Sequence, residues 1–239
     1  MPRAAVRAVW IAVDDNIPQQ IKDLAEDHKA LRARRSTSPQ WFVPRRTARR
    51  EASLRKAAWL TEVHRQRRTG ELLDTQDVIV EYGVREELRR RGWDHDQWDE
   101  APDEAWNPGR WPGSRDCGTS GYPGRLSARL DDALVRRTVA ACWHTSAPAI
   151  EQIQAWRDAH PGIVPPRYEP DEEGRTRLTG PLAAYMRLAD QITTTGTIWR
   201  AGVELGLLQA RAALTAEPDD ALESQESADT GVPVPSAGG

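Results

Sequence analysis

Apolar side chains recur at spacings of three and four residues along much of this chain, which is the period of amphipathic helices. Near the N-terminus this stripe consists of Ile17, Ile21, Leu24, His28 and Leu31. It predicts a helix over residues 17–34, with Asn16 as its N-cap and Pro18 in its first turn. The preceding stretch, Ala4–Val13, is either a strand or the lead-in to this helix, because its periodicity does not decide between the two.

A second helix is predicted over residues 45–69, where Gly70 would end it as a C-cap. Residues 72–93 are helical in pattern on both sides of Gly83-Val84. This order resembles the helix-turn-helix of excisionase-type DNA-binding modules, although the second helix would be about one turn short. The alternative is an ordinary helical hairpin that packs its apolar side chains.

Residues 92–123 differ from the flanking segments because Trp alternates with Asp, Pro and Gly. Dipeptides such as Asn107-Pro108 and Trp111-Pro112 mark turns, so we expect a long acidic loop that separates domains. Residues 215–239 are acidic and rich in small side chains, which predicts a disordered tail. The chain is thus expected to divide into five parts. These are a basic N-terminal helical domain (1–91), a linker (92–123), a central module (124–162), a C-terminal helical hairpin for packing or oligomerisation (163–214) and the tail (215–239).

The central module begins with strict alternation, because Leu126, Ala128 and Leu130 are separated by polar residues. This is the period of a strand with one buried face. Asp131-Asp132 would then open a helix, His144–Ser146 would break it, and Ser146 would cap another helix that tolerates Pro148 in its first turn. The fold class is therefore mainly α, with one short β-strand.

The order of strand, helix, turn and helix resembles the ribbon–helix–helix family of bacterial DNA-binding repressors. In that family two chains pair their short strands into a ribbon that enters the major groove. The resemblance implies a homodimer bound to double-stranded DNA, with base contacts from Arg125, Ser127 and Arg129. It also implies that the amide groups near Ser146 hold a phosphate. It covers about 35 residues, and the expected Gly in the inter-helix turn is missing.

Charge is distributed unevenly along the 239 residues, although the net charge is only −3. Residues 29–68 contain thirteen basic and two acidic residues, a net charge of +11, and residues 71–116 contain six basic and thirteen acidic residues, a net charge of −7. The basic block either binds nucleic acid or docks on the chain's own acidic block. In the first case phosphate contacts would come from Arg45, Arg46, Arg49, Arg50, Arg55 and Lys56.

Signatures of enzymes and of metal sites were not found. The sequence contains no phosphate-binding loop, dinucleotide-binding glycine pattern, nucleophile elbow or zinc-binding HExxH. Cys117, Cys142, His144 and His160 match no zinc-ligand spacing. We therefore expect no catalytic residues, no metal and no cofactor. The two cysteines, the lack of a long apolar run and the acidic pair after the first apolar stretch favour a cytoplasmic protein without a signal peptide or membrane span.

Taken together, these patterns predict a DNA-binding protein, either a bacterial transcriptional regulator or an accessory factor of a mobile element. The alternative is a non-enzymatic interaction or scaffold protein whose basic and acidic blocks dock on each other or on a partner.

Overall fold

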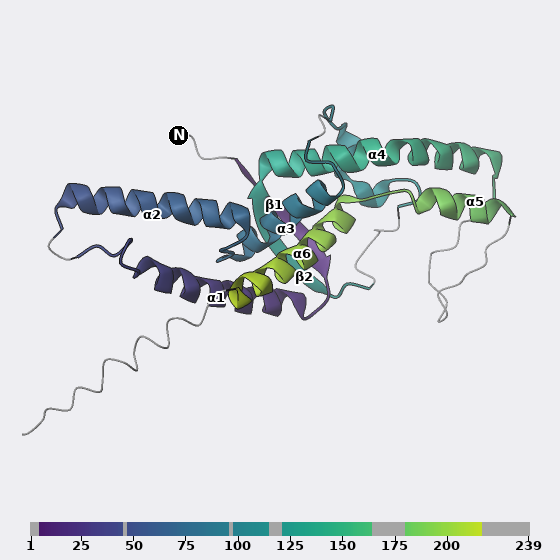
Figure 1. Cartoon of the computed structure of the whole chain (residues 1–239). Coiled ribbons are helices and arrows are strands. Elements are labelled where there is room, and N and C mark those ends of the chain that lie inside the picture. Colours follow the sequence, from purple (N-terminus) through teal and green to yellow (C-terminus); the bar gives the residue numbers. More distant parts are fainter. Residues whose placement is uncertain (1–4, 45–46, 96–97, 115–120, 164–179, 217–239) are drawn as a thin grey trace, which may run out of the picture.

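The computed structural model describes residues 5–44, 47–95, 98–114, 121–163 and 180–216 (Figure 1). The fold is mainly helical, as expected: these residues form six α-helices and a single two-stranded antiparallel sheet. The predicted disordered tail lies outside the described residues from position 217 onward. The strands are β1 (Val6–Val13) and β2 (Gly124–Asp131), and the helices are α1 (Ile17–Ser36), α2 (Arg49–Thr69), α3 (Gln76–Arg90), α4 (Asp132–Ala159), α5 (Gly180–Ala189) and α6 (Thr195–Thr215).

Helix α1 agrees with the predicted pattern, and α2 ends where predicted but begins only at Arg49 rather than at residue 45. The α1 stripe is buried at Ile21, His28 and Leu31. Gly70 ends α2 in the left-handed region at φ 77°, and its N–H is bonded to the carbonyl of Gln66. A side chain at Gly70 would strain this backbone, so the glycine terminates the helix at low cost. The ambiguous stretch before α1 is the strand β1.

The predicted turn within residues 72–93 is absent, because α3 is one continuous helix through Gly83 and Val84. The Thr75 hydroxyl accepts a hydrogen bond from the Val78 N–H at 3.2 Å and caps its start. Both the helix-turn-helix and the helical hairpin are therefore wrong for this segment. Gly83 is needed for a close approach to α6 rather than for a turn.

The predicted strand at residues 125–130 is confirmed as the centre of β2. Its inward side chains Leu126, Ala128 and Leu130 are buried. The resemblance implies that this strand pairs with the same strand of a second chain. This is wrong, because β2 pairs along its whole length with β1 of its own chain, from Val6 opposite Asp131 to Val13 opposite Gly124. Buried Val9, Ile11 and Val13 make the matching inner face of β1.

A second correction concerns α4, which runs without a break through His144–Ser146 and carries Pro148 inside the helix. Pro148 removes one backbone hydrogen bond. The helix continues because each half is packed: Val139 and Cys142 enter the main core, and Ile153 and Trp156 form a second cluster with α5.

One main core connects segments that the sequence assigned to separate domains. It contains apolar side chains of β1, α1, α3, β2, α4 and α6. Trp93, Ala105 and Trp111, from the predicted linker, belong to the same core. Two short 3₁₀ turns, Asp103–Trp106 and Pro108–Arg110, shape this connection. The helices of the predicted C-terminal hairpin pack on different partners, because α5 lies along α4 and α6 lies along α3 (Figure 1).

Candidate nucleic-acid interface

The outward face of the sheet is a two-stranded ribbon of mixed character. On β1 it presents Val6 and Trp10, whose exposed fractions are 65% and 74%. Trp10 lies directly opposite Ser127, and the neighbouring pairs are Ala8 with Arg129 and Ala12 with Arg125. The two arginines are thus diagonal neighbours of the indole. Trp10 is the most exposed large apolar side chain among the described residues.

The three predicted base-contacting residues all occur on this ribbon. Arg125 and Arg129 are exposed, whereas Ser127 is half-buried. Arg125 forms no ion pair or hydrogen bond with any described side chain, while the Arg129 guanidinium lies 3.3 Å from the carboxylate of Asp77 and remains 74% exposed. An ion pair this exposed contributes little and is readily exchanged for another acceptor.

The start of α3 covers the edge of β2 that does not face β1. The Asp77 carboxylate accepts a hydrogen bond from the backbone N–H of Arg129 at 2.9 Å. The amide of Gln76 donates to the carbonyl oxygen of Ser127. These contacts satisfy backbone groups that an edge strand would otherwise leave open, and they hold the ribbon rigidly on the helical core.

Trp10 is a member of this surface that the sequence reasoning missed. The signal was available in the alternation of Val9, Ile11 and Val13, which leaves Trp10 on the opposite face. The alternation could be used only after the stretch was known to be a strand. Its pairing with β2, more than 110 positions away, supplies that information.

The predicted phosphate contacts on α2 separate into two groups. Arg49, Arg50 and Lys56 are exposed and form no ion pair within the described part of the chain. Arg55 instead pairs with Glu51 at 2.8 Å and donates to the carbonyl of Phe42 at 3.0 Å, so it braces the helix against the preceding loop. Arg45 and Arg46 lie outside the described residues.

Ser146 is not a phosphate site, which corrects the prediction. It is fully buried in the middle of α4 and does not begin a helix of its own. Its hydroxyl donates to the carbonyl of Thr193 at 3.2 Å and accepts from the Thr193 N–H at 3.0 Å. Both hydrogen-bonding capacities are used to fasten α4 to the segment before α6.

Part of the basic block docks on the chain's own acids. Asp74 is 1% exposed. Its carboxylate accepts a hydrogen bond from Arg32 at 2.8 Å and two from Nε and Nη2 of Arg67, at 2.8 and 2.9 Å. Burial alone would raise the pKa of the Asp74 carboxyl, but the hydrogen bonds and charges of the two guanidinium groups outweigh it and lower this pKa. Arg65 likewise joins Glu62 at 2.7 Å to Glu71 at 2.8 Å.

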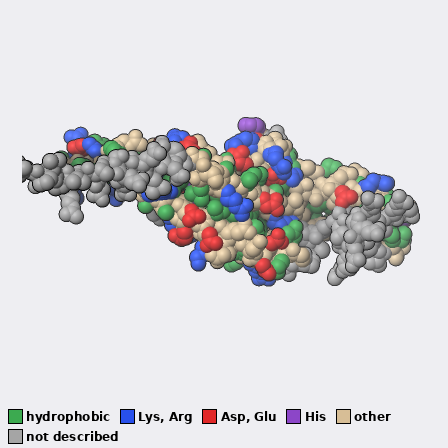
Figure 2. Space-filling view, turned by 60° about the horizontal axis from the view of Figure 1, so that its bottom comes forward, with side chains coloured by type: hydrophobic (Ala, Val, Ile, Leu, Met, Phe, Trp, Pro, Cys, Tyr) green, Lys and Arg blue, Asp and Glu red, His purple; other side chains and the backbone are tan. Residues whose placement is uncertain are grey.

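These pairs offset only part of the block's excess positive charge, and Arg49, Arg50 and Lys56 remain exposed. On the face in Figure 2, basic and acidic side chains are interspersed over the central part of the molecule.

Redox and metal chemistry find little support in the described residues. Cys142 is buried, and burial raises the pKa of its thiol far above the usual range, so it is not a nucleophile. His144 is hydrogen-bonded to the Asp99 carbonyl, and His160 to the Trp156 carbonyl. No group of three His, Cys, Asp or Glu side chains among the described residues is placed to hold a metal ion. Cys117 is not described.

Comparisons with known proteins add no assignment: no model of a protein family matches the chain, and no curated protein or solved structure matches it. The ribbon–helix–helix resemblance is therefore not confirmed, and the internal pairing of β2 and the continuity of α4 differ from what it implies. Within the described residues, no helix combines the length and hydropathy that a transmembrane span requires.

Proposed function

We propose that this protein binds double-stranded DNA through the outward face of the ribbon formed by β1 and β2. The observation that carries this proposal is the arrangement of Arg125 and Arg129 on either side of the pair formed by Trp10 and Ser127. A two-stranded antiparallel ribbon fits the width of the major groove of B-DNA. The role would be that of a transcriptional regulator or an accessory factor of a mobile element.

The side chains on the ribbon suit the two kinds of contact that a major groove offers. An Arg fork donates to O6 and N7 of guanine, and a Ser hydroxyl donates or accepts at several bases. The small apolar side chains of Ala8 and Ala12 match the methyl group of thymine. The hydrogen bond between the start of α3 and the backbone of β2 limits the conformational freedom of this strand. Less conformational entropy is therefore lost when the ribbon binds DNA.

Phosphate contacts in this proposal come from Arg49, Arg50 and Lys56 on α2. Such contacts bind all sequences alike and make the affinity depend on salt. Arg55 and Ser146 are excluded from this role because their polar groups are already engaged within the chain.

A single chain supplies both strands of this ribbon, which separates DNA binding from dimerisation. A homodimer stays a prediction, and it no longer follows from a need to pair strands between chains. Binding to a half-site by a monomer is compatible with the proposal.

The test is a selection of duplexes from a random pool, followed by titration of the selected and an unselected duplex at about 150 mM salt, where weak electrostatic binding is largely lost. Arg125→Ala and Arg129→Ala should each cost about 1–3 kcal/mol on the selected duplex and less on the unselected one. Arg85→Ala, which removes an exposed arginine of α3 paired with Glu81, is the matched control and should change neither affinity. Absence of any selected sequence, or equal losses on both duplexes, would overturn the proposal.

A second candidate function is protein interaction, and one observation favours it. Val6 and Trp10 make half of the ribbon apolar, which suits a protein surface better than a phosphate backbone. The docking of Arg32, Arg65 and Arg67 on the acids Glu71 and Asp74 agrees with it, because these cations are not available to DNA. The two candidates differ in the DNA titration: a protein-interaction ribbon would lose no DNA affinity in Arg125→Ala.

A further inference from the structure

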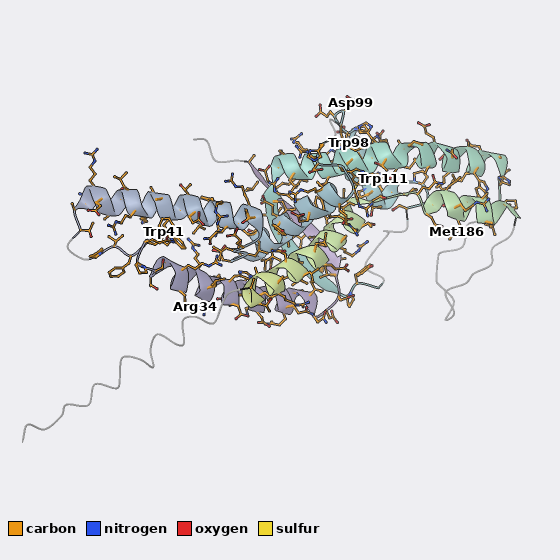
Figure 3. The ribbon with its side chains drawn as sticks, viewed as in Figure 1. Arg34, Trp41, Trp98, Asp99, Trp111 and Met186 are labelled. Atoms are coloured by element: carbon orange, nitrogen blue, oxygen red, sulfur yellow. The ribbon has the colours of Figure 1, made fainter. Side chains whose placement is uncertain are left out.

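A cavity of about 520 Å³ lies between the connection from α3 to β2 and the first turns of α4. Figure 3 shows Trp98 and Asp99 on this connection, above α4. The small side chains of Ala101 and Ala140 leave room between larger groups. Those larger groups are two indoles, two carboxylates and two guanidinium groups, namely Trp98, Trp106, Asp99, Glu100, Arg136 and Arg137. The volume is within the range of small-molecule sites.

The aromatic walls of this cavity are held in place by the core behind them. The Trp98 indole is stacked on the His144 ring at 6.1 Å and meets the Trp93 ring edge-on at 6.2 Å. His144 also donates from Nε2 to the carbonyl oxygen of Asp99 at 3.1 Å, which ties the connection to α4. The cavity is therefore formed before any ligand binds, so little ordering entropy is lost on binding.

The other wall is positioned from the sheet. The Arg7 guanidinium of β1 lies 4.5 Å from the centre of the Trp106 ring. Arg7 also pairs with Asp132 at 2.7 Å, and Asp132 in turn pairs with Arg136 at 2.7 Å. Asp132 is thus shared by Arg7 and Arg136, and Glu100 also approaches Arg136, at 4.0 Å.

Arg137 differs from its neighbour, because its only hydrogen bond with a described residue goes to the backbone carbonyl of Asp94 at 3.4 Å. It forms no ion pair with any carboxylate of the described residues, although it lines a cavity whose rim carries Asp99 and Glu100. Because no carboxylate of the described residues pairs with it, the Arg137 guanidinium, in a lining that also contains two indoles, is suited to bind the carboxylate of a ligand.

We infer that this cavity is a binding site for a planar aromatic carboxylate. The ring would lie against Trp98 and Trp106, where aromatic surfaces favour offset or edge-on contacts. The carboxylate would accept both arms of the Arg137 fork. Arg137 provides a cation without a carboxylate partner among the described residues, and Asp99 and Glu100 of the same lining favour a monoanion over a phosphate, whose second negative charge they would repel. This site lies apart from the outward ribbon residues and does not depend on DNA binding.

The experiment is a ligand-observed NMR titration of the full-length protein, without DNA, using 2-naphthoate as the probe. The expected Kd is about 0.1–1 mM, the range for a small ligand with one charged contact. Two control probes separate the contributions: 2-naphthamide keeps the ring but lacks the charge, and cyclohexanecarboxylate keeps the charge but lacks the planar ring. Each should bind at least about tenfold more weakly than 2-naphthoate.

Arg137→Gln should weaken 2-naphthoate binding by about tenfold or more, because a charge-assisted hydrogen bond is lost. Arg137 is exposed, so this variant should fold like the wild type. Arg68→Gln removes the same charge from an exposed position on α2 and should leave the affinity unchanged. No saturable binding of 2-naphthoate by about 5 mM, equal affinity for the controls, or an unchanged Kd in Arg137→Gln would each overturn the site.

Discussion

Gly83 of α3 lies directly against Gly202 of α6, so closely that a Cβ built on Gly83 would overlap the carbonyl oxygen of Gly202. Gly206 continues the contact, because a Cβ there would collide with the carbonyl of Ile79. These glycines let the two helix backbones approach without side chains between them. Buried Val84 belongs to the same contact, because a Cβ on Gly202 would meet its backbone and side chain.

Gly83→Ala should therefore destabilise the protein, although alanine is the better helix former by about 1 kcal/mol. The methyl group meets backbone atoms that cannot rotate away, and overpacking of this kind costs about 1–3 kcal/mol or more. Urea denaturation followed by circular dichroism measures the change. Arg85→Ala on the exposed side of α3 is the control and should shift stability by less than about 0.5 kcal/mol. A stabilised Gly83→Ala would show that the helices are farther apart.

Asp74 holds two segments of the basic block together, and its replacement should be costly. Asp74→Asn keeps the size but removes the charge that faces Arg32 and Arg67. Because Asp74 is buried but the two arginines are partly exposed, we expect a loss of about 2–3 kcal/mol, below the full cost of breaking a buried pair. Glu26→Gln breaks the exposed pair with Lys29 and should cost about 0.5 kcal/mol or less. Equal unfolding free energies of the two variants would contradict this interpretation.

His28 should make stability depend on pH. It is buried, its Nδ1 accepts from the Leu73 N–H at 3.2 Å, and its Nε2 donates to the Ala210 carbonyl at 3.0 Å. Burial lowers its pKa below the ordinary value of 6.5, partly opposed by the Ala210 carbonyl and by Asp74. As the pH falls through 6.5, His28 becomes protonated in the unfolded chain but stays neutral in the folded protein. The stability is therefore retained above pH 6.5 and is lost as the pH falls below it.

The measurement is the free energy of unfolding between pH 7.5 and 5, where the loss should approach about 1.4 kcal/mol per pH unit at most. His28→Gln keeps one acceptor and one donor but does not titrate, so its stability should change less over this range. The pKa of Asp74 is also lowered, but its contribution is lost only at lower pH, as the pH falls through and below 3.8. If the free energies of unfolding of the wild type and of His28→Gln changed with pH in the same way, the pH dependence would come from other groups.

The exposed cations of α2 should set the salt dependence of DNA binding. If Arg49, Arg50 and Lys56 each contact one phosphate, replacing all three with alanine should lower the slope of log K against log salt by about 2–3. The loss should be the same for selected and unselected duplexes. Arg55→Ala is the neighbouring comparison and should change the slope little, because Arg55 is paired with Glu51. An unchanged slope in the triple variant would show that these side chains are solvent-exposed and do not contact phosphates.

The amino-acid sequence by itself determined where several elements lie and which face of each is buried. The stripe from Ile17 to Leu31 specified α1, Gly70 specified the end of α2, and the alternation from Leu126 to Leu130 specified β2 with its arginines outward. These features depend on neighbours within a few positions, so local periodicity and backbone preference suffice to predict them.

Only the tertiary structure decided which elements pair and where helices continue. Alternation in β2 shows that one face is buried but does not identify the partner strand. The sequence therefore led to a prediction of pairing with a second chain, whereas the partner is β1 of the same chain. Gly83 and Pro148 usually interrupt helices, yet close backbone contact with Gly202 and packing on both sides of Pro148 keep α3 and α4 continuous. Long-range packing energy outweighs such local preferences, because each preference amounts to only about 1–3 kcal/mol.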